Sequence, residues 1–478
     1  MIIAVVIPKE LLGDWVYDIG GGQTELNIYI INKKKTPFIQ KLFWELDKKL
    51  FKGGETLTLK KRGHNLQFVE DTKDIKVEIK NQYIFNFSDV CLVDQGVSQI
   101  KFAVDNNFNV FRQVINSTIS SSYKKVALKI QQGEKEFVTS VRFHSISVSK
   151  NLDITIDTFL ALIKNNIGEL EIKKEKLYLK PNKPDFIQIL KYYIRFCHKI
   201  IDYKFYTNQW FIAYSFSDNT IASFDYKKLN KIIPPNDRFW ADPIVIYEEG
   251  VYYIFIEELL YSNNKGHISV FEIHKDGKIT KPQMIIENDY HMSYPFVFTH
   301  KEQYYMIPET SHNSSIELYK ATTFPYRWEF EKTLFKDIKA TDSTLIEHNN
   351  SWWLFTSIKE FKNGTYDNVL NVYNSIDPIN GKWKKHKLNT VKNGVENSRQ
   401  GGPFIKDNKN NLYRISQNGA NNYGYGFNIH KIVELNQDIY KEETVYSFEP
   451  KGESVIGVHS FSNVNGIHVF DILRRIRK

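Results

Sequence analysis

Cysteine is scarce in this sequence, which has only Cys91 and Cys197 among its 478 residues. Two cysteines without metal-ligand spacing neither form a metal site nor cross-link a chain of this size, so we expect no metal and a reducing, cytoplasmic location. A long hydrophobic run is also missing. The apolar stretch at the start of the sequence, MIIAVVI, is too short for a signal peptide or a membrane span, and it predicts a buried strand.

A phosphate-binding loop is missing as well. The three glycines at positions 20–22 lack the Lys-Ser/Thr ending of a P-loop and the remaining glycines of a dinucleotide fingerprint, so they predict a flexible turn. The positive charge is concentrated in one part of the chain: residues 1–205 hold 32 Lys and Arg against 23 Asp and Glu, whereas residues 206–478 hold 32 of each. A solvated basic face explains this excess. An anionic membrane surface or nucleotide is the alternative, and no pattern indicates nucleic acid.

Hydrophobic residues make up 42% of the sequence and aromatic residues 14%, which is enough for large cores. In the second half of the chain they form a repeated hairpin, in which a strand turns on Gly or Asn and returns as an aromatic strand. In the first copy, PIVIY and VYYIFIE are joined by Glu248, Glu249 and Gly250. The return strands of the five copies contain Tyr252-Tyr253, Tyr304-Tyr305, Trp352-Trp353, Leu412-Tyr413 and Ile467-His468.

The copies recur at intervals of about fifty residues, and further strand-like runs such as GHISVFEI, SIELYKA and NVLNVYN follow them. Such a unit with four short strands is the signature of a propeller blade. The sequence therefore predicts an all-β five-bladed propeller over residues 207–478. The strand at residues 210–216 has no blade of its own, and we expect it to be the outer strand that closes the last blade.

The first strand of each blade lines the central channel of a propeller, so the residues at its entrance converge on one axial pocket. Asp242 and Asp342 stand at equivalent positions of the first and third copies. One Asp-Pro pair is ordinary turn chemistry, but two carboxylates at equivalent positions indicate a function. Buried carboxylates that anchor neighbouring blades are the alternative. The other entrances hold Ser293-Tyr294, Arg399-Gln400 and Val458-His459.

Several stretches of the chain resemble one known family. They are FWADPIVI, SYPFVF with MIPET, TDSTLIEHNNSWWLF, NSRQGGPFI, LYRISQ with NNYGYGFNIHKIVEL, and GVHSF. Together they resemble the five-bladed propeller found as the N-terminal domain of plant glucosamine inositolphosphorylceramide transferases and in bacterial proteins of surface-polysaccharide loci. The fold is also similar to that of the arabinanase, xylosidase and invertase glycosidases. That likeness implies three carboxylates around a sugar: a base or nucleophile before a proline, a second Asp, and a Glu acid.

The resemblance assigns Asp242 to the first of these catalytic carboxylates and Asp342 to the second. Glu309 is the third catalytic candidate, although neither it nor Glu396 stands where the glycosidase acid is expected. Guanidinium and amide groups bind vicinal hydroxyls, and aromatic rings stack on sugar faces. The candidates for substrate binding are Trp240, Tyr294, Arg399, Gln417, Tyr423 and His459. For Arg399, Gln417, Tyr423 and His459 taken singly, a role in satisfying the propeller's own backbone is an equally good interpretation.

Residues 1–170 alternate strand-like runs (IIAVVI, DVCLVD, VALKI) with helix-like runs (PFIQKLFWELDKKLF, TIDTFLALIKNNI). This order predicts an α/β domain with a largely parallel sheet. It resembles the folate-dependent formyltransferase domain that often precedes the propeller in bacterial relatives. The Asn-His pair that such enzymes need is absent, so we expect a degenerate formyltransferase-like domain without formyl transfer.

Residues 171–206 begin as a basic linker and continue as a helix that starts near Pro184 and Asp185. We expect the helix to dock between the two domains. Peripheral contact of residues 185–205 with an anionic membrane is the alternative. The helix has one apolar stripe, consisting of Phe186, Ile189, Leu190, Tyr193, Ile194, Cys197 and Ile201.

The sequence thus predicts a carbohydrate-active protein of surface-polysaccharide or glycolipid assembly. A glycosyltransferase or a transferase component is favoured, in which Asp242 and Asp342 position or deprotonate a sugar hydroxyl. The expected partners are a glycan and a nucleotide sugar as donor substrate, and no motif requires a further cofactor. An inverting glycoside hydrolase of the arabinanase or xylosidase type and a non-catalytic glycan-recognition module are the alternatives.

Overall fold

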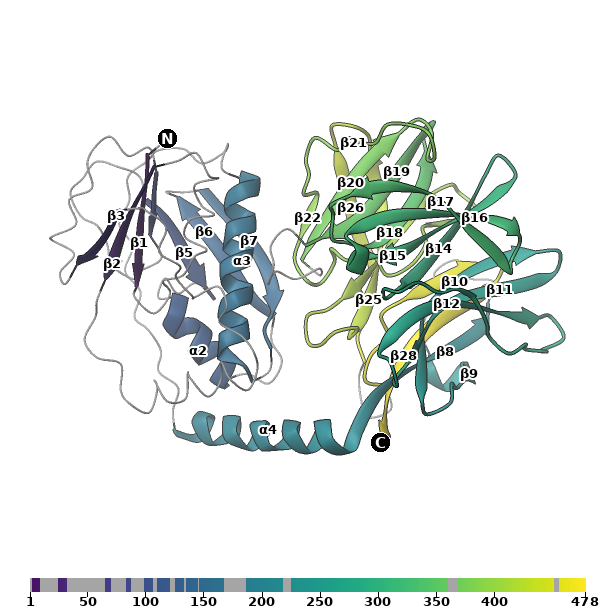
Figure 1. Cartoon of the computed structure of the whole chain (residues 1–478), viewed down its shortest axis with the longest axis horizontal. Coiled ribbons are helices and arrows are strands. Elements are labelled where there is room, and N and C mark those ends of the chain that lie inside the picture. Colours follow the sequence, from purple (N-terminus) through teal and green to yellow (C-terminus); the bar gives the residue numbers. More distant parts are fainter. Residues whose placement is uncertain are drawn as a thin grey trace. The chain divides into compact units, whose positions relative to one another are not determined.

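The computed structural model describes residues 2–8, 25–31, 65–69, 83–86, 99–105, 110–120, 125–132, 135–144, 146–166, 186–217, 225–359, 368–450 and 455–478. The chain divides into two compact units (Figure 1), residues 1–200 with 360–365 and residues 201–359 with 366–478. The boundary between them falls inside helix α4 (Phe186–Phe205).

The described strands of the N-terminal unit form one mixed sheet with the order β3-β2-β1-β4-β5-β6-β7. Strands β1 to β5 pair in parallel, and β6 and β7 are added antiparallel at one edge. The strand expected in MIIAVVI is confirmed as β1, whereas the helix expected at 37–51 and the strand expected at 89–94 lie outside the described residues. The strands are β1 (Ile2–Pro8), β2 (Glu25–Ile31), β3 (Asn65–Val69), β4 (Tyr83–Asn86), β5 (Gln99–Val104), β6 (Lys125–Gln132) and β7 (Lys135–Arg142).

Two helices pack on this sheet. Helix α2 (Val110–Ser120) contacts β5, and helix α3 (Val148–Asn166), which contains all but the last residue of the predicted helical run TIDTFLALIKNNI, contacts β6 and β7 (Figure 1). The rings of Phe102 in β5 and Phe159 in α3 meet edge-on with 5.0 Å between their centroids. Apolar side chains of the helices therefore bury one side of these strands.

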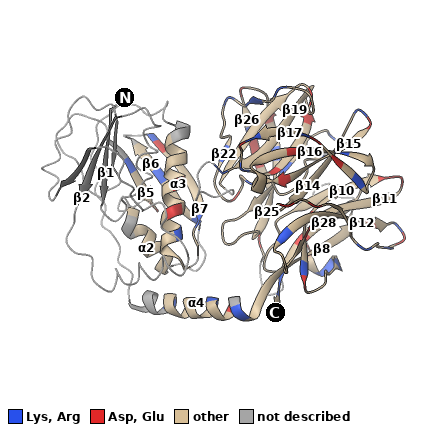
Figure 2. Cartoon of the chain, viewed as in Figure 1, with Lys and Arg blue, Asp and Glu red and all other residues tan. Residues whose placement is uncertain are grey.

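Helix α4 is attached to the N-terminal unit by polar contacts. The Tyr192 hydroxyl donates to the carbonyl of Ile146 at 2.6 Å, and Arg195 Nη2 donates to the carbonyl of Ile119 at 2.7 Å. Two residues of the predicted apolar stripe, Tyr193 and Ile194, are about half exposed, so these two side chains are not buried in the N-terminal unit. The charged side chains of α4 are mainly basic (Figure 2). None of the helices in the described part of the chain is long and apolar enough to cross a membrane.

The described strands of the C-terminal unit form five antiparallel sheets, four of which follow one another along the chain. The first is β10 (Arg238–Glu248), β11 (Val251–Leu260), β12 (Lys265–His274) and β13 (Gln283–Ile286); the second is β14 (Ser293–His300), β15 (Gln303–Thr310), β16 (Ser315–Thr323) and β17 (Arg327–Lys336). The third is β18 (Ala340–His348), β19 (Ser351–Ile358), β20 (Val369–Ser375) and β21 (Lys384–Lys385), with β22 (Lys392–Asn393) also paired to β20. The fourth is β23 (Ile405–Lys406), β24 (Leu412–Asn418), β25 (Gly426–Leu435) and β26 (Tyr440–Phe448).

The fifth sheet combines segments from the two ends of this unit, in the order β27 (Phe461–Val464), β28 (Ile467–Arg477), β8 (Tyr206–Phe216) and β9 (Asn230–Ile232). Strand β8 pairs with β28 along its whole length, so the expected addition of this segment to the last sheet is confirmed, whereas its expected position as the outer strand is wrong. The outermost strand is β9 and not β8. Strand β8 thereby covers the edge of β28, which would otherwise be exposed.

The sheets are arranged around a common centre. Strand β10 contacts β27 on one side and β14 on the other, and β14 contacts β18, so the first strands of these sheets are neighbours. Apolar clusters fill the space between consecutive sheets, including the space between the fifth and the first. Sheets that pack face to face around an axis form a propeller.

Candidate functional site

Three sheets present one side chain each at the same point of their first strands. Strands β10, β14 and β18 each have a β-bulge there, and the residue inside the bulge has a positive φ. These residues are Asp242 (φ 52°), Tyr294 (φ 43°) and Asp342 (φ 51°). The left-handed region is costly for residues other than glycine, and such strain gathers at functional sites. Asp242 and Asp342 thus hold the equivalent positions that the repeat predicts.

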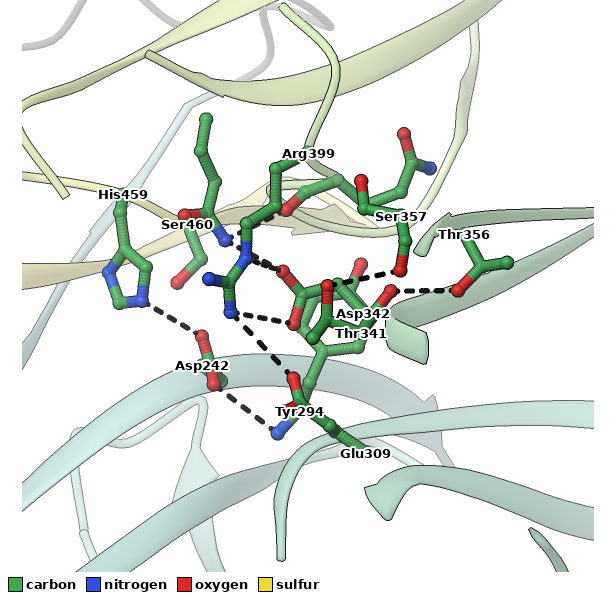
Figure 3. A network of polar contacts seen from close by, with 12 residues as sticks. Asp242, Tyr294, Glu309, Thr341, Asp342, Thr356, Ser357, Arg399, His459 and Ser460 are labelled. Carbon is green, nitrogen blue, oxygen red and sulfur yellow. Dashed lines mark hydrogen bonds and ion pairs between the residues drawn. The ribbon is translucent and has the colours of Figure 1, made fainter. Parts of the chain in front are cut away.

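Asp242 lies beside His459 (Figure 3), with 3.1 Å between Asp242 Oδ1 and His459 Nε2. The other ring nitrogen, Nδ1, is 2.8 Å from Asp471 Oδ2, so the imidazole stands between two carboxylates. All three side chains are buried. Burial lowers the pKa of His459, but the two neighbouring carboxylates raise it by more than burial lowers it, and the resulting pKa is about 10. We therefore assign an imidazolium to this position, with a proton on each nitrogen.

Asp471 in β28 holds this arrangement in place. Its Oδ1 accepts hydrogen bonds from the backbone N–H groups of His459 (3.0 Å) and Ser460 (2.9 Å). Its Oδ2 accepts one from the backbone N–H of Asp242 at 3.1 Å. Hydrogen bonds to the carboxylate and the nearby imidazolium outweigh burial and lower the pKa of Asp471. A fully buried aspartate thus connects the fifth sheet to the first.

Asp342 is held by a cation and an amide. It accepts hydrogen bonds from Arg399 Nε at 2.5 Å and Gln417 Nε2 at 2.9 Å. Arg399 Nη2 is also 3.7 Å from Glu309 Oε2 (Figure 3). Burial and the charge of Asp342 raise the pKa of Glu309 well above its usual range. Burial also raises the pKa of Asp342, but the Arg399 charge opposes this rise, so of the two carboxyl groups Glu309 is the one that holds a proton more strongly.

Glu257 in β11 is a further buried carboxyl group beside Asp242. Burial and the charge of Asp242 raise its pKa well above the ordinary value. Its Oε1 is 3.3 Å from Nε2 of His291, whose Nδ1 accepts the backbone N–H of Gly266 at 2.9 Å. Burial lowers the pKa of His291 to about 4, so this histidine is neutral and differs in charge from His459.

We name these residues the axial cluster: Asp242, Glu257, Glu309, Asp342, Arg399, Gln417, His459 and Asp471. Within the described residues the buried Glu309 Oε2 has no hydrogen bond, and Asp242 Oδ1 has the 3.1 Å contact with His459 Nε2 as its charged partner. Buried polar atoms without partners are rare, and a ligand hydroxyl is one group that can satisfy them. Tyr423 stands beside the cluster and is 43% exposed. Its ring centroid is 5.3 Å from the Arg399 guanidinium carbon and 5.6 Å from the His459 ring.

Two of the aromatic residues predicted to bind substrate are instead part of the framework. Trp240 is packed in an apolar cluster, and its indole N–H donates to Glu258 Oε1 at 3.1 Å. Tyr294 is completely buried, and its hydroxyl lies 2.8 Å from Thr344 Oγ1. The indole beside the cluster belongs to Trp210 of β8, whose ring centroid is 4.3 Å from that of His459. The predicted residues that come together are Asp242, Asp342, Glu309, Arg399, Gln417, Tyr423 and His459.

A metal ion was not expected from the sequence, but the geometry offers three groups that could hold one. Ligand atoms of Asp242, His459 and Asp471 lie within 4.8 Å of one another. A metal needs a ring nitrogen without a proton. In this structure both His459 nitrogens face carboxylates, an arrangement that suits an imidazolium as the cation.

Glu257, His291 and Asp471 were not predicted as members of the site. For Glu257 the sequence does hold a signal, because it follows Tyr252 by the same spacing of five residues that separates Glu309 from Tyr304. The structure gives the two glutamates equivalent partners, since Glu257 pairs with Ala241 and Glu309 with Ser293. Asp471 and His291 have no such repeat partner of their own type.

The model of the family described as "Glucosamine inositolphosphorylceramide transferase 1, N-terminal" matches residues 225–472. The transferase of that name from Arabidopsis thaliana is 32% identical over 258 residues, covering 53% of this chain and 32% of the plant protein. The one from Oryza sativa subsp. japonica is 33% identical over 214 residues, covering 44% of this chain and 28% of the rice protein. The chain thus spans no more than about a third of the relatives it matches.

Solved structures with similarity include two α-L-arabinofuranosidases. The enzyme from Podospora anserina has a TM-score of 0.37 at 12% identity, covering 48% of this chain and 78% of its own. The catalytic domain from Coprinopsis cinerea has a TM-score of 0.38 at 10% identity, covering 55% and 97%. This similarity is too low to support an argument. The family model, in contrast, covers just over half of the chain and includes every residue of the axial cluster, so the chain belongs to the family of the glucosamine inositolphosphorylceramide transferase 1 N-terminal domain.

Proposed function

We propose that this chain is a carbohydrate-active component of glycosyl transfer in polysaccharide or glycolipid assembly, and that its axial cluster binds a sugar. The five sheets would be the blades of a five-bladed propeller. The observation that carries the proposal is the buried pair of Asp242 and His459, in which Asp242 Oδ1 lies 3.1 Å from the imidazolium nitrogen Nε2.

The chemistry of the axial cluster suits a polyhydroxylated ligand. Asp242 Oδ1 can accept the proton of a sugar hydroxyl, which is how a general base activates an acceptor. Arg399 and Gln417 provide planar donors on the other side of the cluster, and the partly exposed ring of Tyr423 suits stacking on a sugar face. We propose that Asp242 orients and deprotonates the acceptor and that Asp342 holds Arg399 and Gln417 in position.

The plant relatives support the transfer reaction, since they are named as transferases. The family model is that of an N-terminal part, and most of the length of those relatives has no counterpart in this match. We therefore propose that this chain contributes acceptor binding, and that a nucleotide sugar serves as the donor either on this chain or on a partner protein. The remaining alternative is that this chain binds a glycan without catalysing any reaction.

One observation favours a hydrolase as the second candidate. An inverting glycosidase needs a protonated carboxylic acid and a carboxylate base roughly 6.5–9.5 Å apart. The raised pKa of Glu309 supplies a protonated acid, and Asp242 supplies the base. In that reaction Glu309 would protonate the leaving-group oxygen while Asp242 activates water.

The test is isothermal titration calorimetry of the full chain with nucleotide sugars and with neutral glycans, in the wild type and in Asp242→Asn. We expect a glycan to bind and Asp242→Asn to weaken its binding about tenfold, which corresponds to one charge-assisted hydrogen bond. Asp438→Asn is the matched control, because that carboxylate is 67% exposed and pairs with Lys387 on the surface. Glycan affinity that is unchanged in Asp242→Asn would refute a role for this residue. Cleavage of the glycan would move the assignment to the hydrolase.

For the N-terminal unit we propose the α/β, formyltransferase-like fold without activity, together with a cytoplasmic location. The order of its sheet, with β1 to β5 parallel, supports the first part. A thermal-shift measurement with folate tests it: a raised midpoint would show that a folate site has been retained.

A further inference from the structure

A second concave site lies away from the axial cluster, on the outer strands of the first two sheets. Its volume is about 420 Å³, which is within the range of small-molecule pockets. We call it the flank pocket. Its lining comes from β13 and the segment after it, from β16 and from β17, and includes Glu287, Asn288, Tyr290, Glu317, Trp328 and Phe330. It shares no residue with the axial cluster.

Aromatic rings form one side of the flank pocket. Phe330 is 56% exposed, which is unusual for a phenylalanine on a strand, and it meets the Tyr319 ring edge-on at 5.8 Å. The indole N–H of Trp328 donates to the carbonyl of Pro325 at 2.7 Å, so this ring is held in one orientation. An exposed and a fixed aromatic ring on one outer strand provide faces on which the C–H groups of a sugar can pack.

Polar groups form the other side, and internal hydrogen bonds hold them in place. Glu317 accepts from the hydroxyls of Tyr290 at 2.6 Å and Tyr319 at 3.0 Å. Burial raises the pKa of Glu317, but these and two further hydrogen bonds lower it below the usual value, so it is ionised. Asn288 Nδ2 donates to the same two tyrosine hydroxyls at 2.9 Å and 2.7 Å. The polar side is therefore rigid before any ligand arrives.

The charge of the pocket limits the class of ligand. Glu287 pairs with Lys265 Nζ at 3.2 Å, and Glu317 accepts hydrogen bonds from four neighbouring groups. The lining thus keeps one negative charge that no cation pairs with in the described residues, and this charge disfavours a phosphate or a nucleotide diphosphate. Fixed aromatic faces beside the tyrosine hydroxyls and the Asn288 amide suit a ligand with many neutral hydroxyl groups. We propose that the flank pocket is a second carbohydrate-binding site, which binds a neutral sugar unit of a glycan chain. This goes beyond the function proposed for the axis, because it concerns a different set of residues.

The two sites can be observed separately in one experiment. The full chain has eight tryptophans, and labelling with 5-fluorotryptophan gives each a ¹⁹F NMR signal. Trp328→Phe assigns the signal of the flank pocket, and Trp210→Phe assigns the signal beside His459. The probes are glucose, galactose, mannose, N-acetylglucosamine, cellobiose and maltose, followed by uridine diphosphate as an anionic comparison.

We expect at least one neutral sugar to shift the Trp328 signal saturably, and Phe330→Ala to weaken that binding about tenfold. Val445→Ala, at a 47% exposed position on the outer strand β26, is the control and should leave the affinity unchanged. A shift at Trp210 alone would overturn the inference and leave the axial proposal standing. A shift at Trp328 alone would support the inference and speak against the axial site. The inference also fails if no sugar moves Trp328, if uridine diphosphate binds there more tightly, or if Phe330→Ala has no effect.

Discussion

His459 carries a positive charge between two buried carboxylates, and this charge links the stability of the fold to pH. Its pKa in the folded protein is about 10, above its ordinary value of 6.5. A group with a raised pKa stabilises the folded state fully below the unfolded pKa, and this stabilisation is lost as the pH rises through the folded pKa. The contribution of His459 should therefore be complete below about pH 6.5 and should vanish towards about pH 10.

This predicts the behaviour of His459→Gln. The variant should be less stable than the wild type by a few kcal/mol at about pH 6, because two buried carboxylates lose their cation. The difference should shrink steadily as the pH approaches about 10. Urea unfolding at several pH values measures it. His312→Gln is the control, since His312 is exposed. Parallel stability curves for His459→Gln and the wild type would contradict the assignment of an imidazolium.

At the scale of single elements, helix α4 has the features of a segment that lies on an anionic surface. Ile194, Ile200, Ile201 and Phe205 are about half exposed on a helix whose charged residues are four basic side chains and Asp202. Apolar side chains with flanking basic groups bind at the interface of anionic membranes. We predict that the protein sediments with vesicles that contain phosphatidylserine, and that salt weakens the binding.

The test uses a double variant, Ile201→Gln with Phe205→Gln. It should lower vesicle binding at least severalfold, because it removes apolar side-chain area that the membrane would bury. Val433→Gln is the control, at a 52% exposed position on β25. Equal binding to vesicles of phosphatidylcholine alone, or no loss in the double variant, would show that α4 is only a connector.

The strands also show how far the sequence alone can predict the site. Repeat spacing correctly predicted the hairpin of β10 and β11, whose turn residues Glu249 and Gly250 have positive φ. The same spacing predicted that Asp242 and Asp342 are equivalent. The hairpin and this equivalence could be predicted because each depends on local periodicity. Repeat spacing could not predict that Trp240 would face the core, because the bulge at Asp242 interrupts the alternation of side chains. Asp471 escaped prediction because its partners His459 and Asp242 come from two different sheets.

At the scale of the whole C-terminal unit, ring closure depends on β8. Its side chains Phe211 and Ala213 belong to the apolar cluster of the fourth and fifth sheets, whereas Ile212 and Tyr214 belong to that of the fifth and first. We predict that a chain of residues 201–478 folds cooperatively, and that one of residues 218–478, which lacks β8, does not. Circular dichroism during heating and gel filtration would measure this. A cooperative, monomeric 218–478 chain would contradict the role of β8.

The pairing of β8 with β28 also sets an order of events during synthesis. Arg474 and Gln209 are hydrogen-bonded at 2.9 Å although 265 residues separate them along the chain. Strand β8 leaves the ribosome long before its partner has been translated, so its edge waits unpaired while the intervening sheets form. Contacts between residues this distant form slowly, because a long loop must first be closed. During that interval the nascent chain presents an open strand edge, which is where chaperones or a second nascent chain would bind.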